Sequence, residues 1–280
     1  MLDREEYIEQ AYLFKALGER LRENMATQDL LLWIKEEILS TTRLPMAMDF
    51  MAAELKLQGV FAPAMAKLSH YFTSFQTYVI AEAENERGKF DISVALKILE
   101  REATYRANGA TPQGVFLYEF ECLCRNRLGY DRGLEAMAGD PMFPQPWKDW
   151  ILTVRRQVGL IDIADLIYVR SDQYVLDCRR QGRDEPGSET PMLFGQKEGR
   201  IAMANRRKDP LLLFAALHRQ LGYPAVPQLV PADRAPDLLP ALMRRIDRLE
   251  ARLKLMQEEF RGGIDITKFY GQPPEPGERD

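Results

Sequence analysis

The sequence contains only two histidines, His70 and His218, and neither has a second ligand at the spacing of helical zinc or di-iron sites. Cysteine is equally scarce, with Cys122, Cys124 and Cys178. The first two are two residues apart on a predicted helix and therefore point to nearly opposite sides. We expect no metal site and no cofactor, with the histidines in core or capping roles.

Glycine-rich phosphate loops are also absent. Neither the pattern G-x-x-x-x-G-K-[ST] nor a G-x-G-x-x-G following a strand occurs, and no other catalytic motif is present. The sequence therefore leaves open whether this protein is an enzyme.

No apolar run is long enough for a membrane-spanning helix, because the longest uncharged run near the middle, 68–81, is short and polar. The first residues lack the basic flank and apolar core of a signal peptide. An odd, small number of cysteines is typical of reduced thiols. We expect a cytoplasmic protein that has no contact with a membrane.

What the sequence does contain is the composition of a globular protein, with 46% hydrophobic and 29% charged residues. Apolar residues recur at helical spacing, and capping residues precede several of these stretches, as at Thr73, Asp91 and Thr111. The fold class predicted is all-α. The main expected helices are 3–24, 27–38, 45–58, 73–87, 91–108, 111–129, 131–138, 147–159, 162–181, 197–208 and 209–221.

Residues 162–181 are ambiguous, because Leu166 to Val169 have strand composition while the longer segment traces one helical face. We predict a single helix of five turns here. A short extended piece is predicted at 191–195.

Five prolines fall between residues 224 and 240, which is typical of an extended, semi-rigid linker. We divide the chain into a helical domain (1–222), a proline-rich linker (223–237), a coiled-coil helix (238–261) and a flexible tail (262–280).

The strongest pattern in the chain is a heptad repeat after this linker, with apolar residues at alternating spacings of three and four. It predicts self-association as a dimer or trimer. The alternative is that this helix packs back on the core of its own chain. The a and d positions are Leu239, Leu242, Ile246, Leu249, Leu253, Met256 and Phe260.

Acidic side chains gather in three helical segments. We favour a solvated face for them, although carboxylates buried together could perform acid–base chemistry. These residues are Glu82, Glu84, Glu86, Glu100, Glu102, Glu119 and Glu121.

Basic side chains form the tentative anion-binding site of Lys197, Arg200, Arg206, Arg207 and Lys208. Other arginines of the central region would join a pocket for a phosphate, a carboxylate or a nucleic-acid backbone. The favoured interpretation is a scattered set of surface ion pairs, because the net charge of −4 is not that of a general nucleic-acid binder. These other arginines are Arg125, Arg127, Arg132, Arg155, Arg156 and Arg170.

From these patterns the leading hypothesis is a non-enzymatic scaffold or adaptor that self-associates through its C-terminal helix and binds a protein partner. One alternative is an anion- or nucleic-acid-binding module that uses the central arginines. Another is a helical enzyme with a carboxylate and arginine site.

Overall fold

The computed structural model describes residues 2–21, 27–85, 90–184, 187 and 190–228. This part of the chain contains thirteen helices and no strand, which confirms the all-α prediction. None of these helices has the length and apolar character needed to span a bilayer. The helices are α1 (Arg4–Arg20), α2 (Thr27–Lys35), α3 (Leu44–Gln58), α4 (Ala62–Lys67), α5 (Ser74–Glu84), α6 (Ile92–Ala107), α7 (Pro112–Arg125), α8 (Tyr130–Ala138), α9 (Gln145–Gln157), α10 (Ile163–Tyr168), α11 (Asp172–Arg180), α12 (Gln196–Ala204) and α13 (Pro210–Leu221).

The predicted capping residues begin their helices as the sequence indicates. Thr73 and Gln76 form a reciprocal capping box at α5, and Thr111 accepts a bond from the Gly114 N–H at α7. Asp209 caps α13, which ends at Gly222 in the left-handed conformation with φ 67°. These bonds satisfy backbone donors that the first turn of a helix otherwise leaves unpaired.

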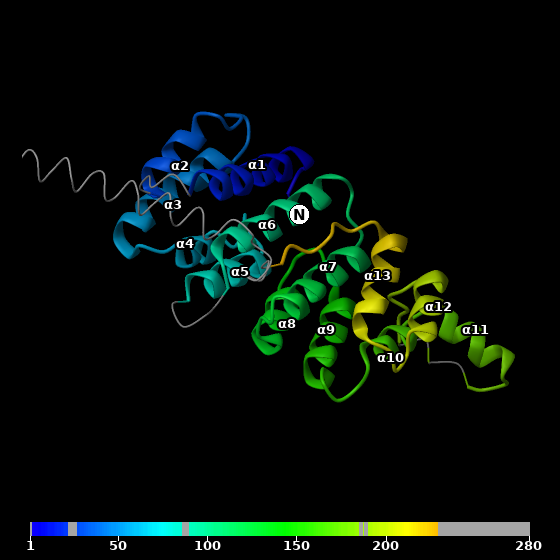
Figure 1. Cartoon of the computed structure of the whole chain (residues 1–280). Helices are drawn as coiled ribbons and strands as arrows, with labels where there is room; N and C mark the ends of the chain where they lie inside the picture. The colour runs from blue at the N-terminus through cyan, green and yellow to red at the C-terminus, as the bar shows by residue number, and fades with distance from the viewer. Residues whose placement is uncertain (1, 22–26, 86–89, 185–186, 188–189, 229–280) are drawn as a thin grey trace, which may run out of the picture. The chain divides into compact units, whose positions relative to one another are not determined.

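Helices that are distant in the chain also pack together, and α1 lies along α6 in the most extensive helix pair (Figure 1). Helix α6 also contacts α5 and α7, and α8 packs on both α5 and α9. In the C-terminal part, α12 contacts α10, α11 and α13, and α13 returns to α7.

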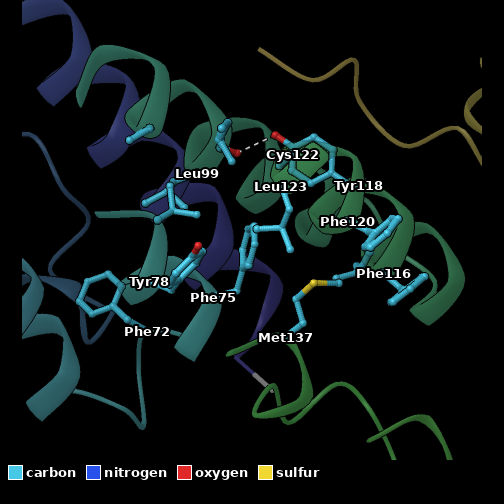
Figure 2. Close-up of a cluster of buried hydrophobic side chains, with 14 of the residues drawn as sticks. Phe72, Phe75, Tyr78, Leu99, Phe116, Tyr118, Phe120, Cys122, Leu123 and Met137 are labelled. Carbon is cyan, nitrogen blue, oxygen red and sulfur yellow. Dashed lines mark hydrogen bonds between the residues drawn. The ribbon is translucent and has the colours of Figure 1, made fainter. Parts of the chain in front are cut away.

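Helix α7 is the centre of the core, because every residue from Gly114 to Leu123 is buried. Phe75 of α5, Leu123 of α7 and Met137 of α8 point into one shared cluster, as Figure 2 shows. The Tyr118 hydroxyl donates to the Ile98 carbonyl of α6 at 2.8 Å. A helix buried on all sides requires a partner for each polar side chain that it carries.

The single helix predicted for 162–181 is wrong. The chain forms α10 and α11 with a break between them, because the Ser171 side chain caps α11 and accepts from the Tyr174 N–H. The N–H groups of Leu193 and Phe194 bond to the Arg170 carbonyl at 2.9 and 3.0 Å, and Ser171 forms an isolated parallel bridge with Phe194. The short extended piece predicted at 191–195 thus supplies the contact that interrupts the helix.

The first residues of the predicted linker lie against the core. Tyr223 is buried, Asn126 of α7 donates to the Pro227 carbonyl at 3.0 Å, and Arg101 of α6 donates to the Ala225 carbonyl. The remainder of that linker, the predicted coiled-coil helix 238–261 with its heptad residues, and the tail 262–280 lie outside the described residues.

Candidate functional site

The most unusual feature of the core is a buried ion cluster in which one guanidinium contacts three carboxylates. Arg106 Nε donates to Glu102 Oε1 at 2.7 Å, and its Nη2 donates to Glu119 Oε1 at 3.1 Å. The same Nη2 also donates to Asp140 Oδ2. All four side chains are at most 2% exposed. We call these four residues the Arg106 cluster.

Three elements place the members of the cluster. Glu102 and Arg106 are one helical turn apart on α6, Glu119 lies on the buried helix α7, and Asp140 follows the C-terminal end of α8. The second oxygen of Asp140 accepts from the Met142 N–H at 2.7 Å. The cluster therefore ties α6, α7 and the turn after α8 into one unit.

The charges of the cluster do not balance, since one guanidinium faces three carboxyl groups. The Oε2 atoms of Glu102 and Glu119 are buried without a hydrogen-bond partner among the described residues. Burial raises the pKa of both carboxyls, and that of Glu119 rises well above the ordinary value. Burial therefore favours the protonated form of these two carboxyls.

The carboxyl oxygens of Glu102, Glu119 and Asp140 lie within 4.8 Å of one another, a spacing that a metal ion could use. Arg106 bonds to all three, however, and its positive charge would repel a divalent cation. The arrangement suits the guanidinium better than a metal.

A small pocket of about 100 Å³ borders the cluster at Asp140. Its other polar residues include Tyr7, Arg43, His70 and Tyr71. Because the other three members of the cluster do not line the pocket, a substrate would not reach them.

The prediction of solvated acidic faces is wrong for the best-buried carboxylates. Glu102, Glu119 and Glu121 are buried, and Glu121 accepts from Tyr223 at 2.8 Å and from Arg125. For Glu119 and Glu121 the signal available in the sequence was their place within an otherwise apolar run, VFLYEFECLC at 115–124. Both acids of α7 lie inside that run, which periodicity alone does not reveal.

The tentative anion-binding residues do not converge on one point. Arg206, Arg207 and Lys208 follow the C-terminal end of α12, whereas Lys197 lies in its first turn and Arg200 in its middle, about 10 and 6 Å from that end at 1.5 Å per residue. Arg206 pairs with Asp165 and lies over the Tyr168 ring, 5.6 Å from its centroid.

Three of the six other central arginines, Arg125, Arg132 and Arg155, pair with acids. Arg155 pairs with Asp131 at 2.7 Å, and Arg132 lies 3.4 Å from Glu82. For these three residues the structure shows separate ion pairs, as the interpretation of scattered pairs expects.

The histidines take different positions. His70 is exposed and lines the small pocket beside Asp140. His218 lies in the last turn of α13, as the sequence indicates, and its ring packs edge-on against Tyr223 at 5.1 Å between centroids.

An apolar groove of about 390 Å³ lies where the turn after α9 meets α7 and α13. Phe120 and Phe214 are buried beneath it, while Leu160 and Ile161 are 84% and 42% exposed. Tyr130 and Cys124 also line this groove, and burial raises the pKa of the Cys124 thiol to about 11. We call it the Leu160 groove.

Comparisons with known proteins yield no match, whether to a family model, to a curated protein or to a solved structure.

Proposed function

We propose that this protein is a non-enzymatic helical scaffold that self-associates through residues 238–261 and binds a protein partner. The binding of a partner is supported by the exposure of two large apolar neighbours on α2, Leu32 at 42% and Trp33 at 67%. Self-association rests on the heptad repeat of the sequence. Tryptophan is among the residues that contribute most to protein interfaces. Leu39, in the turn after α2, is also exposed.

The charged groups of the described residues also favour a non-enzymatic scaffold over the two alternatives. The strongest candidate for acid–base chemistry, the Arg106 cluster, is enclosed, and the pocket beside it is too small for most metabolites. Four of the arginines that would form an anion site, Arg125, Arg132, Arg155 and Arg206, are paired with acids. Both alternatives, an enzyme and an anion-binding module built on these arginines, therefore have less support.

Size-exclusion chromatography with light scattering tests the proposal. We expect the full chain to have the mass of a dimer or trimer, and Leu249→Asp, at a heptad d position, to reduce it to one chain with unchanged helix content. The matched control is Ala251→Asp, at the outward-facing f position, which should leave the mass unchanged.

A wild-type mass of one chain would contradict self-association. A mass that falls with Trp33→Glu but not with Leu249→Asp would instead place the contact between chains on α2.

A further inference from the structure

The Leu160 groove combines an apolar interior with a fixed rim. Gly159 adopts φ 83°, and the N–H groups of Leu160 and Ile161 both bond to the Gln157 carbonyl, at 2.9 and 3.0 Å. This turn holds the Leu160 side chain in solvent instead of allowing it to fold onto the core. An apolar ligand that covers this leucine removes its side chain from water, and this burial lowers the free energy of the complex.

The two charged groups that line the groove, one carboxylate and one ammonium, differ in the partners that they already have. Asp162 lines the groove, but its oxygens accept from the N–H groups of Ala164 at 3.0 Å and Arg207 at 2.6 Å. These donors compensate the carboxylate in part. Lys208 also lines the groove, and its ammonium has no ion pair within the described residues.

The size of the groove favours a small molecule. A volume of about 390 Å³ lies near the lower end of the range for ligand sites, where a few polar groups orient a mainly apolar ligand. The groove offers aromatic and aliphatic contacts from Phe120, Phe214 and Leu160, and one cation at its edge.

We propose that the Leu160 groove binds a small amphiphilic acid, with its apolar body over Phe120 and Phe214 and its carboxylate paired with Lys208. This site is independent of self-association and of the enclosed Arg106 cluster. A neutral or cationic amphiphile lacks the second of these interactions and should bind more weakly.

The experiment uses the full chain and decanoate as the probe, with binding measured by titration calorimetry below the micelle range. We expect saturable binding that Lys208→Glu weakens about tenfold and that Lys208→Arg retains. Leu160→Asp should weaken it as well. The matched control is Lys97→Glu, on the exposed face of α6, which should leave the affinity unchanged.

The alkylation rate of Cys124 tests whether decanoate binds in the Leu160 groove. This thiol lines the groove, whereas Cys122 and Cys178 are buried. Bound decanoate should slow that reaction in the wild type. Decyltrimethylammonium should bind more weakly than decanoate.

The proposal is overturned by an absence of saturable binding or by equal affinity for the two amphiphiles. It is also overturned by Lys208→Glu binding decanoate like the wild type, or by Cys124 reacting at the same rate with and without decanoate.

Discussion

At the scale of single residues, Arg106 is the cation that three buried carboxyl groups of the core share. A guanidinium taken out of water loses its hydration, and three carboxylates here replace it at hydrogen-bonding distance or close to it. The raised pKa of Glu102 and Glu119 reflects the same burial, which disfavours their charged forms.

Arg106→Met should lower the free energy of unfolding by about 3–5 kcal/mol, because it leaves three buried carboxyls without their cation. Urea denaturation measures the change. The control is Arg155→Met, which removes an exposed pair with Asp131 and should change stability little. Equal effects of the two substitutions would contradict a dominant role for the buried cluster.

Glu119→Gln tests the protonation of the cluster. In the wild type the folded chain keeps a proton that the unfolded chain releases above the ordinary pKa of 4.5, so the contribution of Glu119 to stability falls as pH rises through this window. Glutamine does not titrate.

The stability of Glu119→Gln relative to the wild type should therefore increase from pH 4 to pH 8, as followed by thermal unfolding in a series of buffers. A difference between the two proteins that stays constant over this range would show that Glu119 has an unshifted pKa.

At the scale of elements, close helix packing sets where one helix must end. Helix α12 approaches the start of α11 at Gly199, where an added Cβ would lie 2.1 Å from Ser171 Oγ and 2.7 Å from Gln173 Cβ. Since Ser171 also caps α11, this contact and the bridge to Phe194 fix the break that separates α10 from α11.

Gly199→Ala should destabilise the protein by about 1–3 kcal/mol, because the methyl group forces α12 away from Ser171. Gly18→Ala, in α1, is the matched control, since its Cβ would meet only Leu96 at an ordinary 3.6 Å. That substitution should stabilise by about 0.5–1 kcal/mol through helix propensity. Chemical denaturation measures the free energy of unfolding of both variants. Equal destabilisation by both would contradict the tight contact at Gly199.

At the scale of the whole molecule, contacts distant in sequence join the end of α13 to the central helices. The Tyr223 hydroxyl donates to Glu121 Oε2 at 2.8 Å and lies 3.1 Å from the Phe214 carbonyl. Tyr105 of α6 donates to the Leu221 carbonyl at 3.2 Å. These bonds hold the segment after α13 against α6 and α7.

Tyr223→Phe should lower stability by about 1–2 kcal/mol, because it removes one of the two donors to the buried Glu121 carboxylate. It should also increase amide hydrogen exchange at Gly222 to Gln228. Unchanged exchange there would mean that the bonds from Arg101 and Asn126 alone hold this segment.

The sequence by itself determined the helical class and many helix starts, because caps such as Thr73, Thr111 and Asp209 act on N–H groups within a few residues of themselves. Heptad spacing predicts the C-terminal coiled-coil helix, which stays a prediction because residues 238–261 lie outside the described part of the chain. The tertiary structure decided which charges are buried. Whether Glu102, Glu119 and Glu121 face water depends on residues such as Arg106, Asp140 and Tyr223, and on how α7 is covered by helices distant in sequence. It also decided the break at Ser171, because Phe194 pairs there through backbone bonds that no local pattern encodes.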